Sequence, residues 1–317
     1  MRLRSYVVMV MGAVMVAVVC APAVNAASIT MVADNQSWLN AAMWSDSLTP
    51  HSDADYITAA MGTNRLRTSP SGGTAGGNAD FTGNSLTVVS GTYLLYKQVG
   101  GETASLNGGA GDLTLDGQGG ASASLQLAPN GSQAGTTMTL DADELIIASD
   151  SIIEAGGSTA NATVLVDAIL TGSGDLTVRR QGNNNDGNDT DLPTLVSIAS
   201  LDSFTGDLSV TRDTTLDFNS DYVFAGSLSL TDGPDAGVYL AQLNVDQRLE
   251  FYSVNGNGTY VGPGTYSGSS LLALNTTLGA DYFLDGGGTL IVQVPEPASL
   301  ALLGLGAAVL VCVRRRS

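Results

Sequence analysis

The chain has 317 residues, and its 30 acidic and 12 basic residues give a formal net charge of −18. A surface with this charge repels phosphate backbones, so the composition excludes nucleic acid as a partner. His51 is the only histidine, and the two cysteines, Cys20 and Cys312, lie near the two ends. The body of the chain therefore lacks the residues for a histidine-rich metal site, a disulfide framework or a cysteine nucleophile.

The first 26 residues have the features of a signal peptide. Two arginines precede an apolar run over residues 6–23, and Val24-Asn25-Ala26 has the small-x-small pattern of a cleavage site. We expect cleavage between Ala26 and Ala27 after export by the Sec machinery. The alternatives are a retained N-terminal anchor and a lipoprotein acylated on Cys20, although Val19 fits a lipobox poorly.

Residues 27–62 contain the only two tryptophans, Trp38 and Trp44. One interpretation is a platform on which sugar rings stack. The other is a cap over the first rung of a repetitive fold, because the ends of such folds must be covered. We favour the cap. His51 lies in this segment and is the only residue that could serve as the base of a serine triad, but a surface histidine is the simpler interpretation.

Residues 63–293 consist of short alternating strands separated by turns rich in Gly and Asn. A leucine leads many of these strands, and successive leucines are 20 to 32 residues apart, at Leu86, Leu113, Leu145, Leu176, Leu208 and Leu228. Strands recurring at this interval predict a solenoid with an aliphatic interior. Leu113 and Leu115 should face inward and Thr114 outward. The predicted fold is all-β, a right-handed parallel β-helix, and the alternative is a β-sandwich.

A shorter pattern, Phe-x-Gly, precedes three strands at Phe81, Phe204 and Phe224. The glycine allows a tight corner, and the ring can pack below it. These repeats resemble those of autotransporter passengers. The N-terminal segment with Trp38, Trp44-Ser45, Pro50 and Asp55 is also similar to a segment of those proteins. The same holds for the closing segment, in which Gly262-Pro263-Gly264 forms a turn and Leu271, Leu272 and Leu274 would cover the last rung.

The body offers two further kinds of candidate site. Residues 182–191 carry Asp186, Asp189 and Asp191, whose hard oxygen ligands suit calcium. Gly182 and Pro193 break the EF-hand spacing, and a polar loop is the alternative. Carboxylate groups such as Asp141/Asp143/Glu144 and Asp167/Asp175 could supply the two acids of a glycosidase. Because most acidic residues flank turns, turn formation and solubility explain them without catalysis.

The tail, residues 294–317, has three parts in order. Val294, Pro295, Glu296 and Pro297 come first, then an apolar stretch over residues 298–313, then Arg314, Arg315 and Arg316. The prolines keep the chain extended, and a basic end stays on the cytoplasmic side. We therefore expect residues 298–313 to form a single transmembrane helix, which at 16 residues is short and suits a temporary stop in the inner membrane. This tail resembles the PEP-CTERM sorting signal of Gram-negative bacteria that make exopolysaccharide. The resemblance implies that an exosortase removes the tail during export.

Without the signal peptide and the tail, seven basic and 29 acidic side chains remain, a net charge of −22. We expect a protein that passes through the inner membrane as an intermediate and ends at the cell surface or in the extracellular matrix. Its expected role is structural or adhesive, without catalysis, in contact with extracellular polysaccharide. The alternatives are a polysaccharide-degrading β-helix enzyme and a glycan-binding module. No cofactor is expected, apart from the calcium considered above.

Overall fold

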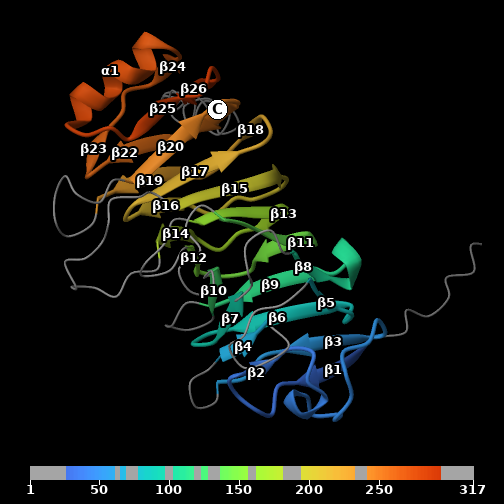
Figure 1. Ribbon diagram of the computed structural model, residues 1–317. Helices are drawn as coiled ribbons and strands as arrows, with labels where there is room; N and C mark the ends of the chain where they lie inside the picture. The colour runs from blue at the N-terminus through green and yellow to red at the C-terminus, as the bar shows by residue number, and fades with distance from the viewer. Residues whose placement is uncertain are drawn as a thin grey trace, which may run out of the picture.

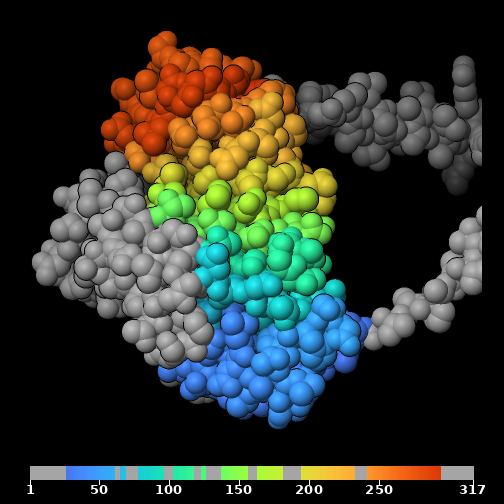
Figure 2. Space-filling model, turned by 45° about the vertical axis from the view of Figure 1, so that its right-hand side comes forward, coloured from blue at the N-terminus to red at the C-terminus, as the bar shows by residue number. Residues whose placement is uncertain are grey.

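The computed structural model describes residues 26–60, 65–68, 78–96, 103–117, 123–127, 136–155, 162–180, 194–232 and 241–293. These residues form one elongated stack in which short strands follow one another from the N-terminal end to the C-terminal end (Figure 1). The bands of colour in Figure 2 succeed one another along the same axis, because each segment lies next to its neighbours in sequence.

All the strands of the described residues belong to three sheets that run along the stack. The twelve-stranded sheet contains β1 (Ala27–Thr30), β3 (Ala54–Ile57), β5 (Ala79–Phe81), β6 (Ser85–Val89), β8 (Thr103–Leu106), β9 (Asp112–Asp116), β11 (Thr136–Ile147), β13 (Ala162–Gly172), β15 (Thr194–Leu201), β17 (Thr214–Phe218), β20 (Ala241–Val245) and β25 (Phe283–Asp285). The ten-stranded sheet contains β2 (Gln36–Ser37), β4 (Arg65–Arg67), β7 (Tyr93–Tyr96), β10 (Ala123–Leu127), β12 (Ser151–Ala155), β14 (Leu176–Arg180), β16 (Leu208–Thr211), β19 (Ser227–Thr231), β22 (Ser253–Gly256) and β23 (Thr259–Tyr260). The four-stranded sheet contains β18 (Tyr222–Val223), β21 (Arg248–Phe251), β26 (Thr289–Val292) and β24 (Gly264–Tyr266). The helical elements are the 3₁₀ turns η1 (Ala41–Met43) and η2 (Asn107–Gly109) and the helix α1 (Ser269–Leu278).

Strand pairing in the described residues is parallel, except where β23 meets β22 and β24 meets β26. The chain alternates between the sheets, so parallel neighbours in the ten-stranded sheet come from successive rungs, as β14 and β16 do. Such stacked parallel sheets are compatible with the predicted β-helix or solenoid. They do not match the antiparallel β-sandwich that was the alternative. The right-handed sense of the coil stays a prediction.

The longest strands, β11 and β13, are paired with an irregularity between them. The register between them shifts between Asp141 and Glu144. The first part of β11 pairs with β8 and the last part with β9. Two short strands, β8 and β9, are thus continued in the next rung by one long strand, and the bulge takes up the extra residue.

The interior is aliphatic because side chains alternate along each strand. Leu113 and Leu115 are fully buried and Thr114 is partly exposed, which confirms the predicted alternation. In the ten-stranded sheet one column of fully buried residues crosses six rungs, at Leu94, Leu125, Ile153, Val178, Val210 and Leu230. Stacked rungs thus share one core that a single rung could not form.

The leading leucines form two columns instead of one. Leu113 pairs with both Leu86 and Leu145 in the twelve-stranded sheet, whereas Leu208 pairs with both Leu176 and Leu228 in the ten-stranded sheet. The predicted step from Leu145 to Leu176 therefore does not connect stacked residues. The error arose because the same short motif leads strands on two faces.

The Phe-x-Gly pattern has a steric basis. All three rings are buried. A Cβ on Gly206 would lie 2.0 Å from the carbonyl oxygen of Gly174, and one on Gly226 would lie 2.2 Å from that of Gly206. Neither Gly206 nor Gly226 has a positive φ. Close packing of successive rungs, and not the tight corner that we expected, therefore requires these glycines.

The C-terminal end is covered by α1, which lies at the end of the stack (Figure 1). Leu271 and Leu274 are buried on the inner side of this helix, as predicted for a cover of the last rung. Leu272 is 45% exposed, which corrects its predicted role, because a helix turns it away from the face that carries the other two leucines. No helix among the described residues has the length and apolar character needed to cross a membrane, and residues 298–313 lie outside that part of the chain.

Candidate functional site

Several predicted site residues lie outside the described residues. These are the sorting motif Val294, Pro295, Glu296 and Pro297, the basic tail Arg314, Arg315 and Arg316, and the calcium candidates Asp186, Asp189 and Asp191. The calcium site stays a prediction. At the predicted signal cleavage point, Ala27 opens β1 and pairs with Ala54, so a strand of the stack starts directly after Ala26.

The two tryptophans do not form an exposed platform, and this corrects the glycan-contact interpretation of Trp38 and Trp44. Both side chains are fully buried. The Trp44 indole Nε1 donates to the carbonyl oxygen of Trp38 at 2.9 Å, and its ring meets Tyr56 edge-on at 4.7 Å between centroids. Trp38 packs against Phe81 at 5.2 Å. The aromatic rings fill the interior at the N-terminal end, as expected of residues that cap a first rung.

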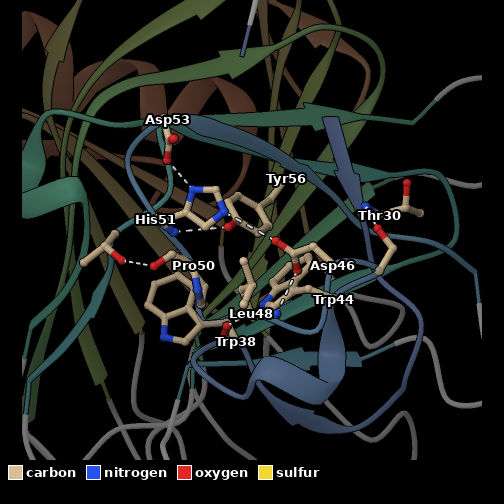
Figure 3. Close-up of polar contacts among 11 residues, drawn as sticks. Thr30, Trp38, Trp44, Asp46, Leu48, Pro50, His51, Asp53 and Tyr56 are labelled. Atoms are coloured by element: carbon tan, nitrogen blue, oxygen red, sulfur yellow. Dashed lines mark hydrogen bonds and ion pairs between the residues drawn. The ribbon is translucent and has the colours of Figure 1, made fainter. Parts of the chain in front are cut away.

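His51 lies beside this cluster, between two carboxylates (Figure 3). Its Nδ1 contacts Asp53 Oδ1, and its Nε2 lies 3.4 Å from Asp46 Oδ2. The hydrogen bond with Asp53 is the main reason why the pKa of His51 is raised, and partial burial opposes it. Because both ring nitrogens face carboxylates, neither is left to accept a proton from a serine hydroxyl. The geometry therefore suits a structural role, in which His51 ties Asp46 and Asp53 together, better than the role of a triad base.

Acidic side chains lie close enough to repel one another near the register shift at residues 141–144. Asp141 and Asp167 are register partners on neighbouring strands, and burial followed by the charges of Asp167 and Asp80 raises the pKa of Asp141. Burial and then the charge of Glu144 raise the pKa of Asp112. Asp167 and Asp175, which the sequence suggested as a possible acid pair, are not register partners. Asp167 lies on β13 of the twelve-stranded sheet, and Asp175 precedes β14 of the ten-stranded sheet. Within the described residues, no group of three metal-ligating side chains could hold an ion.

A second set of acids joins successive rungs of the ten-stranded sheet. Asp175 Oδ1 accepts a hydrogen bond from the backbone N–H of Asp207 at 2.9 Å. Asp207 Oδ1 in turn accepts one from Ser227 at 2.8 Å, and Asp150 Oδ1 accepts a longer one from Asp175 at 3.4 Å. The Gly-Asp-Leu sequences at 174–176 and 206–208 thus each place a carboxylate where it accepts a backbone N–H of the following rung.

The outer face of the same sheet is hollowed into a groove of about 320 Å³, which we call the sheet groove. It crosses β14, β16, β19 and β22 and ends at β23, strands that lie side by side in Figure 1. Its floor is a row of register partners, Thr177, Ser209, Ser229 and Asn255. Asp175 and Asp207 line it at the start of the strands, and Tyr260 lines it at β23.

Tyr260 is 72% exposed, the highest value among the large apolar side chains of the described residues. It follows the turn at Asn257 and Gly258, whose φ values are 45° and 79°. Asn-Gly with two positive φ values is the usual turn of a tight hairpin, which places Tyr260 opposite Asn255. Tyr260 was not among the predicted site residues, and the Asn-Gly pair was the signal that could have identified it.

Comparison with known proteins identifies the tail. Residues 293–316 match the family model described as the PEP-CTERM protein-sorting motif. No curated protein and no solved structure matches the chain. The match confirms the sorting signal predicted at residues 294–317, and such a motif implies an exported protein that an exosortase recognises and sorts. The likeness of the body to autotransporter passengers stays a prediction.

Proposed function

We propose that this exported protein is a structural or adhesive component of the cell surface or of the polysaccharide matrix. The sorting motif at residues 293–316 is the observation that carries the proposal, because it marks the chain for export and for processing at the membrane. After removal of the signal peptide and the tail, the product would be an acidic stack with several long polar faces. Weak contacts repeated along such a stack add up to stable attachment.

The arrangement of the acids supports a structural role. Asp175 and Asp207 each use one carboxylate oxygen to hold the backbone of the next rung. Asp55 does the same for side chains of the next rung, accepting bonds from Asn84 and Ser85 at 2.8 and 2.7 Å. These acids are explained by cohesion of the stack, so they need no catalytic role.

One observation favours the alternative of a polysaccharide-degrading enzyme. Asp141 and Asp167 lie on neighbouring strands, which are about 4.8 Å apart in a sheet. Retaining glycosidases hold their two carboxyl groups about 5–5.5 Å apart and need one of them to stay protonated near neutral pH. The raised pKa of Asp141 is in the direction that such an acid requires.

Two measurements test the proposal. In the producing cells, the protein should be found in the surface or matrix fraction with its tail removed. A variant with Pro295, Glu296 and Pro297 all changed to Ala should instead accumulate in the membrane fraction with its tail attached. Recovery of the wild-type protein in the cytoplasm would refute the proposed location.

The second measurement separates the two functions. The exported protein is incubated with the extracellular polysaccharide of the producing organism, and new reducing ends are counted. We expect no release above that of a boiled control. Steady release that disappears in Asp141→Asn and in Asp167→Asn would overturn the structural role and identify the acid pair as catalytic. Asp202→Asn, at an exposed acid on a neighbouring turn, is the matched control.

A further inference from the structure

We propose that the sheet groove binds an uncharged glycan chain, with Tyr260 as the surface on which a sugar ring stacks. This inference rests on the proposed matrix role and adds the site and the class of ligand to it. The groove is the feature of the described residues that combines a hollow, exposed hydrogen-bonding groups and an exposed aromatic ring.

The floor of the groove offers hydrogen bonds that the protein does not use itself. The hydroxyls of Thr177 and Ser209 have no hydrogen-bond partner among the described residues, and both side chains are partly exposed. Asn255 accepts from the Ser229 hydroxyl at 3.2 Å, and this leaves its amide N–H groups as donors. Hydroxyls that donate and accept, next to an amide, suit the hydroxyl groups of a sugar.

The two acids at the rim keep one oxygen available. The Oδ1 atoms of Asp175 and Asp207 are fixed by backbone N–H groups of the next rung. Their Oδ2 atoms have no partner in the described part of the chain, and both residues are exposed. A carboxylate oriented in this way accepts strong hydrogen bonds from neutral hydroxyl donors.

Charge selects between uncharged and anionic glycans. The lining residues include two carboxylates and no basic side chain. Arg179, the nearest arginine in sequence to the groove residues of β14, is engaged by Glu154, with Nε to Oε1 at 2.8 Å. An anionic polysaccharide would meet repulsion from the rim and from the acidic body, so the ligand class that fits is uncharged.

The backbone next to Tyr260 is anchored to the stack. Its neighbour Val261 is buried, and the Val261 N–H donates to the Val254 carbonyl oxygen at 2.8 Å. Alternation along the strand then turns the Tyr260 ring outward over the end of the groove. An aromatic side chain with two χ angles gives a large contact area at a small cost in side-chain entropy, as in other recognition surfaces.

The shape of the groove favours a chain over a small molecule. Its polar row repeats once per strand, so its groups lie about 4.8 Å apart along the stack. A volume of about 320 Å³ lies at the lower end of ligand pockets, which suits a shallow contact with a few sugar rings of a longer polymer.

The test uses the exported protein and an immobilised panel of uncharged and anionic oligosaccharides. We expect binding to members of the uncharged group and none to the anionic group. Tyr260→Ala should raise the Kd by about 3- to 10-fold, because it removes one ring contact. Tyr260→Phe should leave the Kd nearly unchanged, since it keeps the ring. Tyr252→Ala is the matched control, because Tyr252 is 49% exposed and does not line the groove.

A second variant tests the floor of the groove without changing the stack. Ser209→Ala removes a hydroxyl that has no described partner, so thermal stability should not change while the Kd rises. Failure of every uncharged glycan to bind overturns the inference, and so does equal binding by wild type and Tyr260→Ala. Preference for the anionic group would overturn the assigned ligand class.

The outcomes can be separated from those of the proposed function. A protein found in the matrix with its tail removed, but with binding unaffected by Tyr260→Ala, refutes the groove and leaves the location intact. A protein that binds uncharged glycans through Tyr260 but stays in the cytoplasm refutes the location and leaves the groove intact.

Discussion

The two ends of the stack meet the same physical demand in different ways. At the N-terminal end, the edge of β1 is covered by a loop. Ser45 donates its N–H to the Thr30 carbonyl oxygen at 2.9 Å, and its hydroxyl accepts from the Thr30 N–H at 3.2 Å. At the C-terminal end, the side chain of Asn275 on α1 covers β25. Its amide donates to the Phe283 carbonyl oxygen and accepts from the Phe283 N–H, each at 2.9 Å.

The interiors behind these edges also differ. The N-terminal end is filled by the rings of Trp38, Trp44, Tyr56 and Phe81, whereas α1 covers the C-terminal end with two leucines. An exposed sheet edge invites pairing with another chain, so both ends need closure. At both ends, one polar side chain and its neighbouring backbone satisfy the hydrogen bonds of the sheet edge. The apolar cover differs, since aromatic rings provide it at one end and helix leucines at the other.

The largest expected effect is at the aromatic end. Trp44→Ala should lower the free energy of unfolding by about 3–5 kcal/mol, because it leaves a cavity among fully buried rings and removes the bond to the Trp38 carbonyl. Urea unfolding followed by circular dichroism measures the change. Leu48→Ala, at a 55% exposed residue of the same loop, is the control and should change stability little. Equal stabilities of the two variants would show that this end is not held by its rings.

A smaller effect is expected at the helical end. Asn275→Ala should cost about 1–3 kcal/mol, because it leaves both backbone groups of Phe283 without their partner in a buried site. The neighbouring Thr276→Ala, on the exposed side of α1, is the control. Hydrogen exchange should locate the loss at the Phe283 amide. Unchanged protection of that amide would mean that α1 closes the edge by packing alone.

The smallest effect is pH-dependent and belongs to the N-terminal end. The pKa of His51 is raised and that of Asp53 is lowered, each chiefly by their mutual hydrogen bond. The His51 contribution is therefore complete below the unfolded pKa of about 6.5 and is lost as the pH rises through the folded value. The Asp53 contribution is present above about pH 4 and is lost as the pH falls through its lowered value.

The stability difference between wild type and His51→Gln should thus be greatest between about pH 4 and pH 6.5. Chemical unfolding at several pH values measures it, and Asp46→Asn should reduce it less than Asp53→Asn. A difference that grows above neutral pH would contradict the assigned contacts.

The sequence predicted the strands well because alternation and turn residues are local signals. Leu113, Thr114 and Leu115 illustrate this. It did not predict which strands stack, since Leu145 and Leu176 carry the same motif but belong to different sheets. It also gave no sign of α1, whose ten residues mix leucines with Ser, Thr and Asn, residues that favour helices weakly.

The groove could not be predicted for the same reason. Its floor joins Thr177, Ser209, Ser229 and Asn255, which are separated by unequal lengths of chain, and only the register of the sheet brings them together. The interpretation of Trp38 and Trp44 as an exposed platform was wrong, because residue type alone does not reveal whether a side chain is buried. The sorting motif, by contrast, is contiguous in sequence and was predicted directly.

One set of hydrogen bonds between rungs, those accepted by aspartate side chains from backbone N–H groups, has a direction. Asp34, Asp150, Asp175, Asp207 and Asp221 each accept a backbone N–H from a residue later in the chain. A polypeptide that leaves the translocation channel from its N-terminus, as the predicted signal peptide implies, would thus present aspartate acceptors to several of its later rungs. Each rung that docks would hinder backward sliding, so that folding outside the membrane would itself draw the chain across.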